Sequence, residues 1–96
     1  MPEVMSREKA LEYKAAGNAL FTAQKFAEAE KQFSLAIEQD PTDHVFYSNR
    51  SGCYASLGQY EKALADGAKC VEIKPDWHKG YNRKALAEYH LRMYDE

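Results

Sequence analysis

The sequence matches itself when it is shifted by 34 residues, and this internal repeat restricts the fold more than any other feature. Tyr13, Tyr47 and Tyr81 occupy one repeat position, and Pro41 and Pro75 occupy another. Two further positions repeat in the same way: Phe26, Tyr60 and Tyr94; Ala29 and Ala63. A repeat of this length is typical of paired antiparallel helices, and each pair must stack on the next to bury a core. The sequence therefore predicts an all-α solenoid.

Signals for helix ends divide the chain into five helices. Ser6 is a suitable N-cap, and Asp76 is expected to cap the last helix. Helices should end before Pro41 and Pro75, because the residue before a proline avoids the helical conformation, and Gly58 should end the third helix. The predicted helices cover residues 7–23, 26–39, 44–57, 60–73 and 77–92. We interpret residues 1–96 as one domain. Its two repeats cover residues 10–43 and 44–77, a half repeat covers residues 78–96, and a sixth helix is expected to begin within residues 94–96.

Composition restricts the partners and the compartment. With 96 residues, 45% hydrophobic and 29% charged, the chain is expected to form one small folded domain. The formal net charge of −2 argues against nucleic acid as a partner. The N-terminus has no basic segment followed by an apolar run, and no stretch is as long as a membrane span. Cys53 and Cys70 are too few for a disulfide framework and are interpreted as packing residues, which fits a protein of the cytoplasm or nucleus.

No pattern in the sequence indicates catalysis. The three histidines lack metal-ligand spacing, and no glycine-rich phosphate loop follows a strand. No serine or cysteine has a base partner at the spacing of a catalytic triad. We therefore expect no metal, no cofactor and no enzymatic activity.

The first helix of each repeat has a packing side and an opposite arc of about 100°. The polar residues on that arc include Lys14, Asn18, Asn49, Lys79 and Arg83, and no acid joins them. In a stack of helix pairs the first helices line the concave surface, so these side chains should face one groove. Cations and carboxamides bind carboxylates, and a peptide that ends in aspartate presents two carboxylates close together. The alternative is a charged arc that is only solvated surface.

Small, large and aromatic residues stand at the positions of the tetratricopeptide repeat (TPR) signature. In the first repeat they are Gly17, Leu20, Ala29, Phe33, Ala36 and Pro41, and in the second Tyr47, Tyr54, Gly58, Tyr60, Ala63 and Pro75. The chain thus resembles the TPR family over nearly its whole length, which implies a right-handed superhelix of about two and a half repeats. Gly67 stands where a large residue is usual, so a neighbouring helix is expected to approach closely there.

Three segments also resemble the two-carboxylate clamp of cochaperone TPR domains. They are Lys14-Ala15-Ala16-Gly17-Asn18, Tyr47-Ser48-Asn49-Arg50, and the run from Lys74-Pro75 through Trp77, Lys79, Gly80 and Tyr81 to Arg83. The last segment is most like the first TPR domain of the Sti1/Hop type. The resemblance implies binding of the Glu-Glu-Val-Asp terminus of cytosolic heat-shock chaperones, with the seventy-kilodalton class favoured and the ninety-kilodalton class as the alternative.

The resemblance also assigns roles to residues around the clamp. Its apolar contacts to the peptide would fall on Phe21, Gly52 and Ala55, whereas Arg50 and Lys84 are interpreted as structural or rim residues. Three alternatives stay open: a general TPR scaffold, the targeting domain of a larger enzyme, and a self-associating adaptor. Self-association would use the apolar residues of the last helix, which are Tyr81, Ala85, Leu91 and Tyr94. The alternative to self-association is a monomer with a frayed end.

Overall fold

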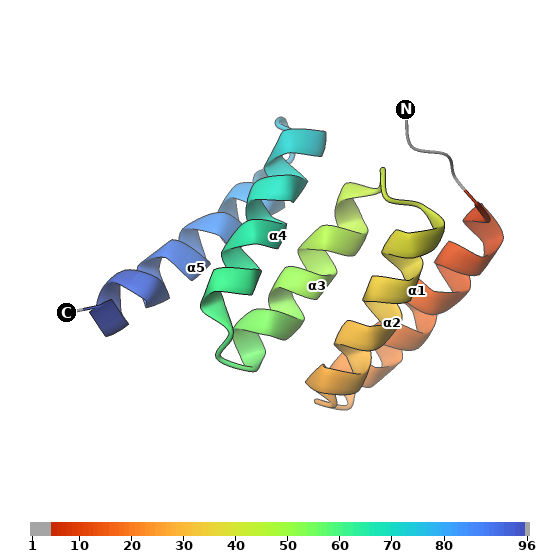
Figure 1. Cartoon of the computed structure of the whole chain (residues 1–96), viewed down its shortest axis with the longest axis horizontal. Coiled ribbons are helices and arrows are strands. Elements are labelled where there is room, and N and C mark those ends of the chain that lie inside the picture. Colours follow the sequence, from red (N-terminus) through yellow and green to blue (C-terminus); the bar gives the residue numbers. More distant parts are fainter. Residues whose placement is uncertain (1–4, 96) are drawn as a thin grey trace.

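The computed structural model describes residues 5–95, with side chains up to residue 93. Over this range the chain forms five helices and no strand: α1 (Arg7–Thr22), α2 (Phe26–Gln39), α3 (His44–Ser56), α4 (Tyr60–Ile73) and α5 (His78–Asp95). They follow one another along the long axis of a slab of 43 × 30 × 18 Å, with α1 and α2 at one end and α4 and α5 at the other (Figure 1). The predicted all-α arrangement of helix pairs is confirmed.

Side-chain caps explain where the first and third helices begin. The Ser6 hydroxyl accepts a hydrogen bond from the backbone N–H of Lys9 at 3.2 Å, as the sequence predicts. The Asp43 carboxylate caps α3 by accepting from the backbone N–H of Val45 at 2.8 Å. This second cap was not predicted, although an aspartate just before a helix is a common capping signal.

The last helix differs from its prediction at both ends. It begins at His78, so Trp77 rather than Asp76 is the residue before it, because a turn joins the N–H of Trp77 to the carbonyl of Lys74 at 3.2 Å. It also continues to Asp95, since no glycine or proline stops it. The predicted start of a sixth helix at residue 94 is therefore wrong. Tyr94 was also expected among the apolar residues for self-association, but its side chain lies outside the described residues.

Two phenylalanines fill the junction between the first two helix pairs. Phe33 of α2 and Phe46 of α3 are both fully buried. Phe33 packs with Ala29 and Cys53, and a Cβ atom added at Gly17 would lie 2.6 Å from its ring. Each buried phenylalanine stabilises the stack by roughly 2–3 kcal/mol through removal of apolar surface from water.

Gly67 lets α5 approach α4 closely. A Cβ atom at Gly67 would lie 2.8 Å from the backbone nitrogen of Lys84, a distance that real Cβ atoms do not adopt. The predicted close approach is therefore confirmed.

Arg50 ties α3 to α4 through a nearly buried ion pair. Its Nε lies 2.7 Å from Oδ2 of Asp66 and its Nη2 lies 2.9 Å from Oδ1, while Nη1 donates to the hydroxyl of Ser34 at 3.1 Å. The guanidinium also lies 5.6 Å from the ring centre of Tyr54. Burial raises the pKa of Asp66 more than the neighbouring guanidinium lowers it. Of the two roles expected for Arg50, structural or rim, these contacts support the structural one.

Replacing Arg50 should destabilise the fold. Arg50→Met would leave Asp66 buried without its counter-charge, so we expect a loss of about 2–4 kcal/mol in the free energy of unfolding, measured by urea denaturation. The double variant R50M/D66L should recover most of that loss, because it removes the unpaired charge as well. Unchanged stability of the single variant would contradict the structural role.

The two turns within the helix pairs provide a matched test of backbone strain. Gln24 and Gly58 share a repeat position, and both adopt positive φ angles, 62° and 76°. Only glycine adopts this conformation without steric cost, so Gln24→Gly should stabilise the domain by about 0.5–1 kcal/mol. Gly58→Ala should destabilise it by a similar amount, since nothing lies within 4 Å of the added Cβ and only the backbone is strained. Denaturant melts of both variants check this, and a destabilised Gln24→Gly would refute it.

Candidate functional site

Side chains from four helices meet around a cavity of about 180 Å³. It is lined by Asn18 and Phe21 of α1, Phe33 of α2, Asn49 of α3, and Lys79 and Arg83 of α5. Two cations and two carboxamides thus surround a partly aromatic hollow.

The structure places the predicted site residues in two groups. Of the five polar candidates, Asn18, Asn49, Lys79 and Arg83 line the cavity together with Phe21. Three other candidates do not line it: Lys14, Gly52 and Ala55. Lys14 is half-buried one turn before Asn18, which puts both on the same face of α1.

Phe33 is the lining residue that the sequence did not assign to the site. Its repeat position indicates a packing aromatic of α2, and the arc of polar residues lies on the first helix of each pair. Its ring occupies the space above Gly17. A glycine on one helix that faces an aromatic residue on the next is the sequence signal that could have indicated the position of Phe33.

Arg83 is held against α3 without a carboxylate partner. Its Nε donates to the hydroxyl of the buried Ser48 at 3.4 Å, and a Cβ atom at Gly52 would lie 3.0 Å from its Cζ. Within residues 5–93 no acidic side chain forms an ion pair with Arg83. Desolvation lowers the pKa of this guanidinium. A partly dehydrated cation of this kind is suited to an external anion.

The two asparagines offer neutral hydrogen-bonding groups beside the cations. Nδ2 of Asn49 lies 3.5 Å from Oδ1 of Asn18, which is the outer limit of a hydrogen bond. Such a weak contact leaves both amides able to bind another group. The site can therefore combine charge with directed donors.

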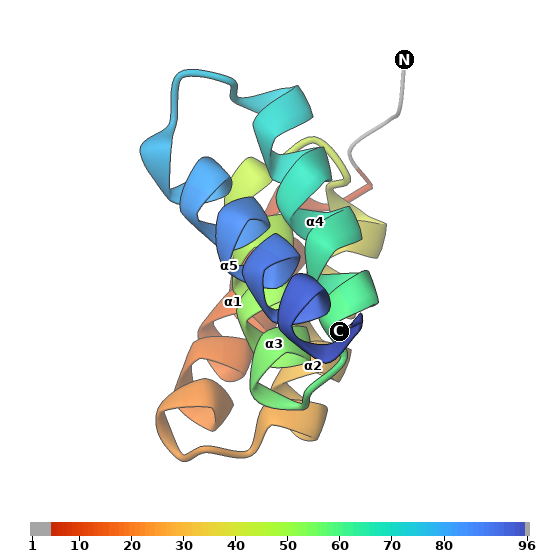
Figure 2. The same cartoon turned by 90° about the vertical axis from the view of Figure 1, so that its left-hand side faces the viewer.

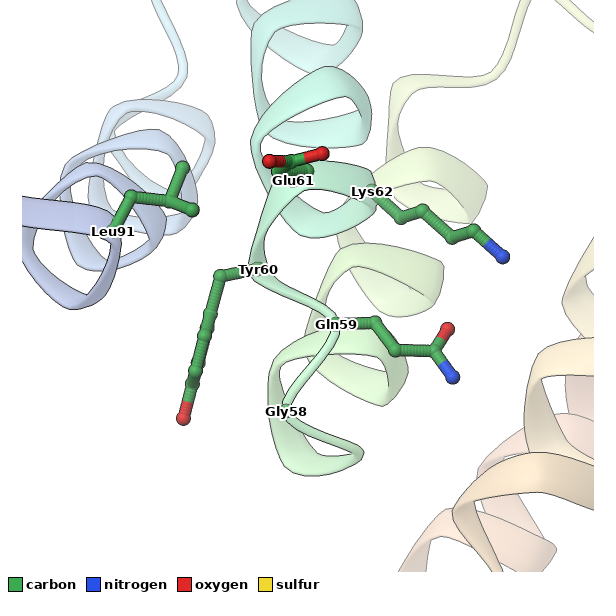
Figure 3. Close-up of a pocket in the computed structure, with 6 residues that line it drawn as sticks. All are labelled: Gly58, Gln59, Tyr60, Glu61, Lys62 and Leu91. Carbon is green, nitrogen blue, oxygen red and sulfur yellow. The ribbon is translucent and has the colours of Figure 1, made fainter. Parts of the chain in front are cut away.

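Two further hollows lack this chemistry. One, of about 580 Å³, lies between the α3–α4 turn and Leu91 of α5 (Figure 3). Among the side chains that the structure describes, its charged lining residues are Glu61 and Lys62, of opposite sign. The other, of about 460 Å³, lies on the outer side of α5 and again pairs one acid with one base. Counting the side chains of residues 5–93, the hollow that Arg83 lines is the one of these three with two cations and no acid. Over the described part of the chain, no group of histidine, cysteine or acidic residues is arranged to hold a metal ion.

The outer face of α5 exposes several apolar side chains beside the charged Glu88 and Arg92. Figure 2 views the stack from this end, with α5 in front of the other helices. The exposed fractions are 47% for Tyr81, 45% for Leu86, 58% for Tyr89 and 57% for Met93. Of the apolar residues predicted there, Ala85 is also exposed, whereas Leu91 is half-buried. Self-association through this face stays a prediction.

None of the helices over residues 5–95 is both long enough and apolar enough to cross a membrane.

Comparison with known proteins assigns the fold to a family. The model of the tetratricopeptide repeat matches residues 33–65. An Hsp70-Hsp90 organising protein of Plasmodium falciparum is 51% identical over 90 residues, which are 94% of this chain and 36% of that protein. Heat shock protein STI1 of Saccharomyces cerevisiae is 50% identical over 86 residues, 88% of this chain and 15% of that protein. The chain thus spans about a third or less of the length of these relatives.

Solved structures agree with this assignment. The TPR2B domain of yeast Sti1, in a complex with an Hsp70 peptide, has a TM-score of 0.87 and 33% identity, covering 92% of this chain and 70% of that one. The first TPR of Spaghetti (RPAP3), bound to the HSP90 peptide SRMEEVD, has a TM-score of 0.91 and 26% identity, covering 98% of this chain and 75% of that one. The chain therefore belongs to the tetratricopeptide-repeat family, and within that family it is similar to the Sti1/Hop proteins.

Proposed function

We propose that the cavity between α1, α3 and α5 binds the free C-terminal carboxylate of a peptide tail that ends in aspartate. The observation that carries this proposal is that Lys79, Arg83 and two asparagines surround one hollow, and that none of its described lining residues is acidic. The similar Sti1 and Spaghetti domains, whose structures contain Hsp70 and HSP90 peptides, support it. The Spaghetti ligand ends in Glu-Glu-Val-Asp, which presents a side-chain carboxylate next to the main-chain one.

The residues of the cavity suggest how such a tail is held. The two cations neutralise the paired carboxylates, and Asn18 and Asn49 donate hydrogen bonds that fix their orientation. Lys14, one turn from Asn18, extends the positive charge along α1. The aromatic part of the lining suits an apolar side chain next to the terminal aspartate.

The partner class is proposed from the similar proteins. The tail is that of a cytosolic heat-shock chaperone, with the seventy-kilodalton class favoured by the resemblance to Sti1/Hop proteins and the ninety-kilodalton class as the alternative. Both kinds of peptide occur in the similar structures. The role of this single domain, residues 1–96, is then binding in the cytosol rather than catalysis, and it recruits a chaperone to whatever is attached to it.

A second candidate function is a scaffold that binds through the outer face of α5. The observation that favours it is the row of exposed apolar residues on that helix, among them Tyr81, Tyr89 and Met93. The two functions use different surfaces, so peptide binding separates them.

The terminal carboxylate should decide binding. A free-acid peptide that ends in Glu-Glu-Val-Asp should bind with a dissociation constant of roughly micromolar order, because the site is small and open. Amidation removes one of the two negative groups, so calorimetric titration should show most of the affinity lost. Equal binding of both peptides would rule out a carboxylate site and favour the scaffold.

The two cations of α5 should contribute to binding but not to the fold. Arg83→Ala and Lys79→Ala should each weaken binding by about 1.5–3 kcal/mol, since each removes a charge-assisted hydrogen bond. Thermal unfolding should change little, because neither side chain has an acidic partner within residues 5–93. Arg92→Ala is the matched control, because Arg92 is an exposed arginine on the outer side of the same helix. This variant should bind the peptide as tightly as the unmodified domain does. Normal binding of both α5 variants, or unfolding of both, would show that the assignment is wrong.

A further inference from the structure

The two junctions between helix pairs are built from different residues at the same repeat positions. A shift of 34 residues relates Phe33 of α2 to Gly67 of α4, and Phe46 of α3 to Gly80 of α5. The first junction is therefore filled by two buried aromatic rings, whereas the second is lined by two glycines.

The glycines allow backbone and side-chain atoms to come into direct contact at the second junction. A Cβ atom at Gly67 would lie 2.8 Å from the nitrogen and 3.0 Å from the Cα of Lys84, and 3.2 Å from the carbonyl carbon of Arg83. A Cβ atom at Gly80 would lie 3.0 Å from the sulfur of Cys70. Because the atoms facing Gly67 belong to a helix backbone, they cannot yield separately, and any side chain there must displace α5.

Displacement of α5 would change the cavity, because its cations and its amides stand on different helices. Lys79 and Arg83 belong to α5, whereas Asn18 and Asn49 belong to α1 and α3. The hydrogen bond from Arg83 to Ser48 is already 3.4 Å long, so a shift of a few tenths of an ångström would break it. Gly67 itself is buried on α4 and does not line the cavity.

From these contacts we infer that Gly67 is a positioning residue for the carboxylate site, acting through Arg83 and Lys79. The inference rests on the proposed function, because it concerns the geometry of the same site. The close approach at Gly67 brings the two cations within reach of a carboxylate held by the asparagines of α1 and α3. A ring at this position, as in the first junction, would hold α5 too far away.

The test is Gly67→Ala, titrated by calorimetry with the free-acid peptide ending in Glu-Glu-Val-Asp. We expect roughly ten-fold weaker binding, the loss of part of the charge-assisted bonds made by α5. In the Gly67→Ala background, Arg83→Ala should have less effect than in the unmodified domain, whereas Asn18→Ala should keep its full effect. A merely structural role would lower the folded fraction and leave both effects unchanged. Normal affinity together with an unchanged Arg83→Ala effect would overturn the inference.

Gly58→Ala is the control for lost stability. It strains a turn at φ 76° but places its Cβ more than 4 Å from any neighbour, so it should reduce stability and leave tail affinity unchanged. If Gly67→Ala does not fold, Gly80→Ala gives a smaller displacement against the Cys70 sulfur and carries the same expectation. Affinity unchanged in folded Gly80→Ala would then contradict the inference.

A measurement without peptide separates this inference from the proposed function. The NMR signal of the Arg83 Nε–H should shift in Gly67→Ala, because its bond to Ser48 is broken, while the Arg50 Nε–H signal should not move. If the unmodified domain binds no tail but the Arg83 signal shifts, the proposed function fails and the positioning of Arg83 by Gly67 stands. An unmoved Arg83 signal would refute that positioning whatever the tail does.

Discussion

The distance between neighbouring helix pairs is set by the residues that fill each junction, and every cross-helix contact of the cavity depends on that distance. Helices are stiff, so a displacement at one residue carries the rest of the helix with it. Phe33 and Phe46 hold the first junction open with buried rings. At the second, Gly67 allows the backbone of α5 to lie against α4. The spacing of the side chains around the cavity thus depends on the residues that fill the two junctions, Phe33 at the first and Gly67 at the second.

Arg50 and Arg83 show how one residue type serves two purposes in this fold. Arg50 forms two hydrogen bonds to Asp66, so its positive charge is neutralised by a carboxylate of the same chain. Arg83 is partly dehydrated like Arg50, but its described contacts are a hydroxyl and a glycine rather than a carboxylate. Dehydration without a counter-ion costs folding energy, and the pKa of Arg83 is lowered for that reason. An external carboxylate would offset that cost, which is why the second arginine and not the first is assigned to binding.

Much of this arrangement could be predicted from the sequence because it follows from periodicity. The 34-residue shift gave the helix pairs, and prolines 41 and 75 marked two helix ends correctly. The rotation of 100° per residue identified Asn18, Asn49 and Arg83 as neighbours although they lie on three helices. These inferences need only regular geometry and the order of the residues.

What could not be predicted depends on contacts between specific side chains. The Arg83 side chain of α5 packs against Ser48 and Gly52 of α3 only in one particular rotamer. Periodicity does not specify that rotamer. The contribution of Phe33 to the cavity needs the depth of the groove, and not only the side of the helix on which the ring lies. The length of α5 was underestimated because the expected repeat, rather than any residue that stops a helix, set its end.

The central claim is that Arg83 and the two asparagines form one carboxylate site, and side-chain NMR during a peptide titration tests it most directly. Addition of the free-acid tail should shift the Nε–H of Arg83 and the side-chain amides of Asn18 and Asn49 together, along one saturation curve. The Nε–H of Arg50, which is held by Asp66, should stay in place. Shifts confined to the outer face of α5, with the Arg83 and asparagine signals unmoved, would contradict the account.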